Sequence, residues 1–173
     1  MNALERKNTN MKKLMLLVLA GLALFVAVSA YAANNDTQTV TFEVQAINEI
    51  TVSGDPAALI INAATAGAEP DAVTDATTTY AITNNVLNKK ITGDLDSAMP
   101  ANVTLTIALV ACDTAVSAGT VDLTDGNAHD LVTSIDLVAD AAGNTITYTL
   151  DATVAAGVLA SDTRTVTLTI ADG

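Results

Sequence analysis

The sequence contains little of the chemistry on which most enzymes depend. Its 173 residues include one cysteine, one histidine, no tryptophan, two phenylalanines and three tyrosines. A single histidine, His129, cannot build the His-based clusters that hold zinc, and Cys112 lies in no motif that would make it a nucleophile. Gly-x-Ser-x-Gly, a Walker loop and a dinucleotide-binding glycine fingerprint are also missing. We therefore expect a non-enzymatic protein with no catalytic residue, metal site or cofactor.

One cysteine cannot form an intramolecular disulfide, so the fold must be stabilised by packing. We expect Cys112 to be a buried small apolar residue. The alternative is that its thiol pairs two chains. Because large aromatics are scarce, the core must consist of small branched side chains, and the abundant threonines between them are typical of half-buried strands.

Basic residues are also few outside the beginning of the chain. Four of the seven lysines and arginines, and one of the 19 acidic residues, precede Leu14. The rest of the chain therefore carries three basic and 18 acidic residues, a net charge of −15 (3 minus 18). Such a surface repels nucleic acid and anionic lipid, so neither is an expected partner. The acidic residues are spread along the chain, which favours a solvated surface over an acidic tail.

The first 32 residues have the pattern of a secretory signal peptide. Lys12 and Lys13 precede an uncharged apolar run, Leu14 to Val28, and small residues follow it. This order predicts a signal-peptide helix with cleavage after Ala32, or alternatively after Ala30. Met11 is an alternative start, and an uncleaved membrane anchor is the alternative interpretation of the run. We expect a secreted protein, periplasmic, cell-surface or extracellular, with no membrane association after cleavage.

Residues 33–173 are predicted to form a single all-β domain. Short segments of alternating apolar and polar residues are separated by turn signals, and none has helical periodicity. This spacing predicts an antiparallel β-sandwich of the Greek-key type. Ala63–Thr77 is expected to be a loop and Ala142–Asn144 a turn. The expected strands are Ala58–Asn62, Thr78–Thr83, Lys89–Leu95, Val103–Leu109, Val121–Leu123, Leu131–Ala139, Thr145–Val154 and Thr163–Ala171. The apolar Val110 and Cys112 suggest that the strand from Val103 continues beyond Leu109.

The clearest alternation occurs in the first segment of that domain, Thr37–Val52. One face carries Val40, Phe42, Val44 and Ala46, and the opposite face carries threonine and acidic residues. The alternation fails once, at Ile47–Asn48, which predicts a bulge or a hinge between two strands. The stretch could pair within its own sheet or with a neighbouring molecule, and the sequence leaves both open.

One loop has residues that could hold a calcium ion. Asp122, Asp125, Asn127 and Asp130 lie close together and supply oxygen ligands. Their spacing differs from the EF-hand pattern, and β-turns are rich in Asp and Asn for backbone reasons. We therefore expect a turn here, and surface exposure for the adjacent His129.

Both ends of the predicted domain resemble the group of secreted β-sandwiches that includes spore coat protein U and the chaperone–usher pilins. The N-terminal match is Thr39–Ala46 followed by Ile50–Ser53, and the C-terminal match is Ala156-Gly157, Ser161–Thr163 and Thr165–Ile170. Where that group typically has a cysteine, this chain has Ile50. The resemblance implies an immunoglobulin-like sandwich that a neighbour's N-terminal strand completes, with no catalytic site.

Two functions are therefore expected from different classes. The first is a pilin-like or coat-like structural subunit that forms a homo-oligomer or fibre by strand pairing. Val40, Phe42, Val44 and Ala46 would form the assembly strand, and Ile47 and Asn48 the hinge. The alternative is a secreted adhesion module that binds a carbohydrate or protein through its loops, notably Ala63–Thr77 and Leu123–Asp130. The sequence does not identify a ligand.

Overall fold

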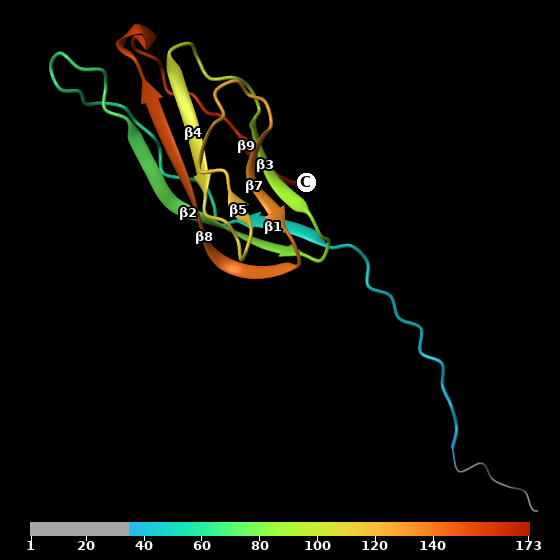
Figure 1. Ribbon diagram of the computed structural model, residues 1–173. Helices are drawn as coiled ribbons and strands as arrows, with labels where there is room; N and C mark the ends of the chain where they lie inside the picture. The colour runs from blue at the N-terminus through green and yellow to red at the C-terminus, as the bar shows by residue number, and fades with distance from the viewer. Residues whose placement is uncertain (1–34) are drawn as a thin grey trace, which may run out of the picture. The chain divides into compact units, whose positions relative to one another are not determined.

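The computed structural model describes residues 35–173. The predicted signal peptide, the cleavage residues Ala30 and Ala32 and the alternative start Met11 lie outside the described residues. The chain divides into two units, Met1–Glu43 and Val44–Gly173. The described part of the first unit, residues 35–43, has no regular secondary structure. The second unit contains all the described strands (Figure 1).

The described residues are all-β and contain no α-helix, as the alternating sequence predicts. A single 3₁₀ turn, η1 (Val154–Ala156), interrupts the strands. Every strand pair is antiparallel. The strands are β1 (Asn48–Val52), β2 (Val73–Asn84), β3 (Lys89–Leu95), β4 (Val103–Leu109), β5 (Val116–Ser117), β6 (Thr120–Asp122), β7 (His129–Ile135), β8 (Val138–Ala152) and β9 (Val166–Asp172).

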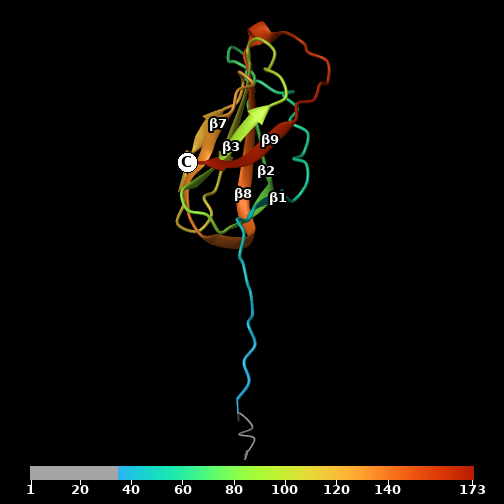
Figure 2. The same ribbon diagram turned by 90° about the vertical axis from the view of Figure 1, so that its right-hand side faces the viewer.

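The strands form two sheets around one core. One sheet has the order β1-β2-β8-β4-β6 and the other the order β5-β7-β3-β9. Figure 2 shows β7, β3 and β9 side by side. Inward-facing side chains of both sheets pack into a single buried cluster, which includes Tyr80 of β2, Ile107 of β4, Ile91 of β3 and Leu131 of β7. The core is aliphatic with two tyrosines, as the composition requires.

Several predicted element boundaries are wrong. Ala58–Asn62 forms no strand, although it is a short apolar run. Leu59 and Ile61 are only partly buried and Ile60 is exposed, because this segment crosses between β1 and β2 without a strand to pair with. The predicted loop Ala63–Thr77 is also too long, since β2 begins at Val73 and a bridge joins Ala64 to Pro70.

The predicted turn at Ala142–Asn144 lies inside a strand. β8 continues from Val138 to Ala152, and Figure 1 shows its first half as a broad bend. Gly143 has φ +102°, a value that favours glycine, and the β2–β8 register shifts nearby, between Tyr80 and Ile82. The turn-forming residues here therefore bend β8, and the strand stays paired with β2 on both sides of the bend. Local sequence does not distinguish such a bend from a turn that ends a strand.

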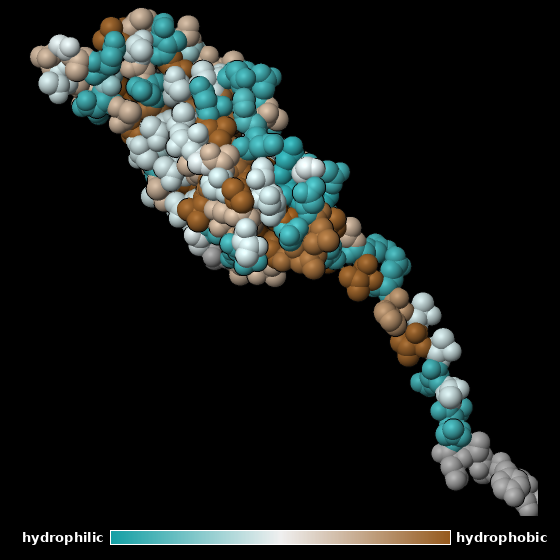
Figure 3. Space-filling model, viewed as in Figure 1, coloured by the Kyte–Doolittle hydropathy of each residue, from teal (hydrophilic) through white to brown (hydrophobic). Residues whose placement is uncertain are grey.

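The outer face of the first sheet is rich in threonine. Threonines alternate with buried residues along β4 and β8, and Thr74 and Thr149 share a hydrogen bond between their hydroxyls at 3.0 Å. Figure 3 shows this face as largely pale, which corresponds to side chains of intermediate hydropathy. One face of these strands is thus apolar and buried, and the other is mostly threonine, with the exposed Asp151 of β8 opposite Thr104, and is compatible with water.

Candidate assembly interface

The predicted assembly strand is the most exposed apolar segment of the described chain. We define residues 37–47 as the arm. It has no strand or helix, and the side chains of Val40, Phe42 and Val44 are 76%, 88% and 81% exposed. Ala46 is also exposed. Figure 3 shows apolar residues separated by polar or neutral ones along the arm. Of the stretch Thr37–Val52, for which the sequence leaves pairing within the domain and pairing with a neighbour open, only Asn48–Val52 forms a strand in the described residues.

The chain becomes a strand between the two predicted hinge residues. β1 begins at Asn48, which pairs with Asn84, and its register with β2 continues to Val52 opposite Tyr80. Ile47 lies just outside the strand and is 42% exposed. The one break in the alternation therefore coincides with the end of the β1–β2 ladder.

Asn85, the first residue after β2, binds the base of the arm. Its backbone N–H donates to the carbonyl of Ile47 at 3.1 Å. Its side-chain Oδ1 accepts from the Ile47 N–H at 2.7 Å, and its Nδ2 donates to the Gln45 carbonyl at 2.8 Å. Asn85 was not predicted from the sequence, although three asparagines within residues 84–88 were an available signal.

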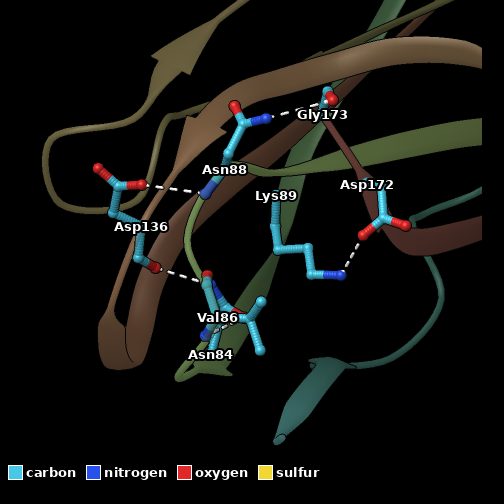
Figure 4. A network of polar contacts seen from close by, with 7 residues as sticks. All are labelled: Asn84, Val86, Asn88, Lys89, Asp136, Asp172 and Gly173. Atoms are coloured by element: carbon cyan, nitrogen blue, oxygen red, sulfur yellow. Dashed lines mark hydrogen bonds and ion pairs between the residues drawn. The ribbon is translucent and has the colours of Figure 1, made fainter.

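Two further asparagines, Asn84 at the end of β2 and Asn88 in the turn between β2 and β3, bind different segments (Figure 4). The buried Asn84 donates from Nδ2 to the carbonyls of Val86 and Asp136, at 2.6 and 2.7 Å. Asn88 has φ +55°, which asparagine tolerates, and its Nδ2 donates to the Gly173 carbonyl at 3.2 Å. The turn between β2 and β3 is therefore a junction that binds the β7–β8 connection, the end of β9 and the base of the arm.

β9 forms one edge of the second sheet. It pairs with β3 over its whole length, from Lys89 opposite Asp172 to Leu95 opposite Val166. Its other edge pairs with no strand among residues 35–173. The inward side chains Val166, Leu168 and Ile170 are only partly buried, although they pack against the core. An edge strand of this length presents unpaired N–H and C=O groups, which are a template for another strand.

β1 forms the corresponding edge of the first sheet, and the two edge strands contact each other across the core. Ile50 of β1 is partly buried and Val52 is 53% exposed. Both strands thus leave apolar side chains incompletely covered at the same margin of the domain.

All three basic side chains of the described residues are in ion pairs. Lys89 pairs with Asp172, Lys90 with Asp130 at 3.1 Å, and Arg164 with Asp162 at 2.6 Å. Hydrogen bonds from Lys89 and Arg164 lower the pKa values of Asp172 and Asp162. Two of these pairs lie at the ends of β9, and the remaining surface is acidic.

The Asp/Asn-rich loop is occupied by its own hydrogen bonds. Asp122 Oδ1 accepts from the Thr124 N–H at 2.7 Å, and Asp125 Oδ1 accepts from the Asn127 N–H at 2.9 Å. His129 Nε2 lies 2.9 Å from Asp125 Oδ1, and this contact is the main reason that the pKa of Asp125 is lowered. No group of three or more candidate ligands that could hold a metal ion occurs in residues 35–173. The backbone explanation of this motif therefore accounts for the loop.

Cys112 is buried, as expected, with 1% of its surface exposed. It lies beside Tyr80, whose hydroxyl donates to the Val110 carbonyl at 2.7 Å. Burial raises the pKa values of both groups. A protonated, inaccessible thiol cannot pair two folded chains, so this alternative is not supported.

Comparison of the chain with protein-family models, with curated proteins and with solved structures finds no significant match. Within residues 35–173, no helix is long and apolar enough to cross a membrane. The proposed role therefore depends on the geometry described above.

Proposed function

We propose that the protein is a secreted, non-enzymatic structural subunit of a surface fibre or coat. Copies would assemble when the arm of one molecule adds as a strand to the free edge of β9 in the next. The observation that carries this proposal is the presence in one chain of an exposed alternating arm and a seven-residue edge strand with partly covered apolar side chains. No cofactor, nucleic acid or membrane lipid is required.

The sheet topology supports an immunoglobulin-like Greek-key sandwich that lacks one strand. In that fold one sheet has the order A-B-E-D and the other C-F-G. The order β1-β2-β8-β4 corresponds to A-B-E-D, and the pair β3-β9 corresponds to C-F. Strand G would then pair along the edge of β9 that has no partner. A strand supplied by a second copy would complete the sheet.

The arm has the side-chain pattern that this position requires. Val40, Phe42 and Val44 repeat every two residues, as do Val166, Leu168 and Ile170 of β9. Strand addition gives affinity through main-chain hydrogen bonds and specificity through alternate side chains. Burying an exposed Val or Phe side chain contributes roughly 1.5–3 kcal/mol, so three of them could support a specific interface.

The leader and the charge are consistent with this role. A signal peptide would export the chain, and we propose a cell-surface or extracellular location. The net charge of −15 after the leader (3 minus 18) would keep a Thr/Val-rich β protein soluble before assembly.

One end of the domain favours a second candidate, an adhesion module. The connection between β1 and β2 meets the β8–β9 connection there, where the Val154 N–H donates to Glu69 Oε2 at 2.5 Å. Val154, Val158 and Leu159 are exposed in the same connection. Exposed apolar residues on loops are a feature of binding sites. A carbohydrate or protein ligand for these loops is the alternative function.

Substitution in the arm tests the assembly proposal. Phe42→Asp places a charge on the proposed inward face, and Thr41→Asp places the same charge on the opposite face as a matched control. We expect Phe42→Asp to weaken self-association at least tenfold in sedimentation and to abolish filaments in electron microscopy, with a smaller effect of Thr41→Asp. Equal effects of the two variants, or a monomeric parent protein at high concentration, would contradict the proposal and favour the adhesion module.

A further inference from the structure

The side chain of Asn85 replaces part of the β1–β2 ladder. The register ends at Asn48 opposite Asn84, so Ile47 is the next residue and lies opposite Asn85. The Asn85 N–H donates to the Ile47 carbonyl, as in a ladder. The return bond is made by the Asn85 side chain, whose Oδ1 accepts from the Ile47 N–H, while its Nδ2 reaches the Gln45 carbonyl. One residue thus binds three backbone groups at the base of the arm.

These bonds limit where the chain can reverse direction. To pair with an edge strand of its own domain, the arm must turn back before it enters β1. Tight reversals favour Gly, Asn or Asp at their centre, and the arm has no glycine or proline between Gln45 and Asn48. Asn48 is already paired with Asn84, and Asn85 binds both Gln45 and Ile47. A reversal that keeps these bonds must therefore occur upstream of Gln45.

A reversal upstream of Gln45 would use the apolar residues of the arm. A hairpin loop takes two to five residues, so Val44, and with it Phe42, would lie in or next to the turn. Only the residues before them would remain to pair with β9. A second molecule, in contrast, can offer its β9 edge to Val40, Phe42 and Val44 together.

We propose that Asn85 acts as a clamp that prevents the arm from pairing with β9 of its own chain and so reserves it for a second copy. This inference rests on the proposed function, because it assumes that the arm pairs with β9. It assigns Asn85 a positioning role that residues of the arm and of β9 do not have. The partner that it selects is another copy of this chain.

Cross-linking can separate pairing within a chain from pairing between chains. Thr41→Cys in the arm and Thr169→Cys in β9 place thiols on two exposed positions, and Cys112→Ala removes the native thiol. Protein purified after expression of the full chain is treated with a short bismaleimide. A link within one chain gives a monomer of altered mobility, and a link between chains gives dimers and longer ladders. As an independent check, one protein that carries only Thr41→Cys and one that carries only Thr169→Cys, both with Cys112→Ala, are mixed. A dimer that forms in this mixture identifies the link between chains.

With Asn85 present, we expect links between chains to dominate. Asn85→Ala removes two side-chain hydrogen bonds, each of modest net stability, so we expect the ratio of internal to intermolecular links to rise roughly three- to tenfold. Faster hydrogen exchange at the Ile47 amide would accompany this rise. Asn88→Gly is the matched control, because it removes an asparagine side chain from the same turn, tolerates φ +55° and leaves the base of the arm bound.

Each other result has a definite meaning. Links between chains with an unchanged ratio in Asn85→Ala would overturn the clamp and leave the proposed assembly intact. Mostly internal links in the presence of Asn85 would overturn both the clamp and the proposed assembly. An equal rise in Asn88→Gly would show a general effect of the turn and would also overturn it. If neither type of link forms, the pairing of the arm with β9 is wrong, and the clamp is rejected with it.

Discussion

The hexapeptide Val-Thr-Leu-Thr-Ile-Ala occurs twice, at residues 103–108 in β4 and at residues 166–171 in β9. In β4 the first, third and fifth residues are buried, and Ile107 is completely inaccessible. In β9 the same three residues are only partly buried. β4 lies inside its sheet, with β8 on one side and β6 on the other, whereas β9 pairs with β3 alone among the strands of residues 35–173. Identical sequences thus differ in burial because they differ in neighbours.

The arm extends this comparison to a segment that forms no strand with any part of residues 35–173. Residues 40–44 read Val-Thr-Phe-Glu-Val, which has the same alternation as the two hexapeptides, yet the three apolar side chains are almost fully exposed. Alternation therefore specifies which side chains can be buried together, and the number of neighbouring strands decides how far they are. The edge strand β9 has partly covered apolar side chains, and the arm has exposed ones with the same alternation. Pairing of the two would bury both sets, which is the physical basis of the proposed assembly.

The largest effect should come from truncating the fifth residue of each hexapeptide. Ile107→Ala removes a fully buried side chain and should lower the free energy of unfolding by about 2–5 kcal/mol. Ile170→Ala should cost less than half as much in the monomer, because part of that side chain already contacts water. Urea unfolding at low protein concentration measures both. Equal losses would mean that β9 is as well covered as β4.

A smaller loss of stability is expected from adding a methyl group at Gly93 of β3, the neighbour of β9. Gly93 lies in β3, and a Cβ added there would come within 2.6 Å of Leu131 Cδ1 and 3.4 Å of Leu168 Cδ2. Because the contact with Leu131 is shorter than van der Waals distance, Gly93→Ala should displace the buried Leu131 side chain of β7 and destabilise the domain by about 1–3 kcal/mol. Thr92→Ala, at the next position on the opposite face, is the control and should change stability little. Thermal unfolding of both variants tests this, and a neutral Gly93→Ala would show that the Leu131 side chain can move aside without cost.

Ionic strength should alter assembly more modestly. Residues 33–173 carry a net charge of −15 (3 minus 18), so copies repel one another. Raising the ionic strength from about 0.01 to 0.15 M shortens the Debye length from about 30 to about 8 Å, which should strengthen self-association severalfold. Sedimentation across a salt series measures this. Weaker association at higher salt would instead indicate that ion pairs hold the copies together.

The smallest effect concerns the ion pair at the end of β9. The hydrogen bond from Lys89 lowers the pKa of Asp172 below its ordinary value of 3.8. A lowered folded-state pKa stabilises the protein above pH 3.8, and this contribution is lost as the pH falls through the folded-state value. Asp172→Asn should lower the Tm slightly at neutral pH and leave it unchanged in acid. Because Asp172 is exposed, a large change at neutral pH would contradict this account.

The fold could be predicted in part. The absence of helical periodicity and the alternating segments correctly predicted that residues 35–173 are all-β, and β3 was predicted at its observed bounds. β4 begins at the predicted Val103 but ends at Leu109, before the apolar Val110 and Cys112 that suggested a longer strand. Ala58–Asn62 was wrongly predicted as a strand because an apolar run does not reveal whether a neighbour is available. The turn at Ala142–Asn144 was wrong because Gly143 bends a strand that remains paired on both sides of the bend.

The proposed site was also only partly accessible to prediction. The arm and the break at Ile47–Asn48 were identified from alternation alone. Asn85 was not, because its role depends on Gln45 and Ile47, some 40 residues earlier in the chain. The free edge of β9 was not predicted either, since its sequence is the same as that of a fully covered strand.

The sequence by itself determined the alternating segments, the acidic charge, the aliphatic core and the alternation of the arm, because these depend on the type and spacing of neighbouring residues. Only the tertiary structure decided how many neighbours each strand has, and that β9 pairs with β3 alone among the described strands. It also decided that Asn84, Asn85 and Asn88 bind three distant segments of the chain. Hydrogen-bond partners in a sheet come from elsewhere in the chain, so a strand's own residues cannot specify them.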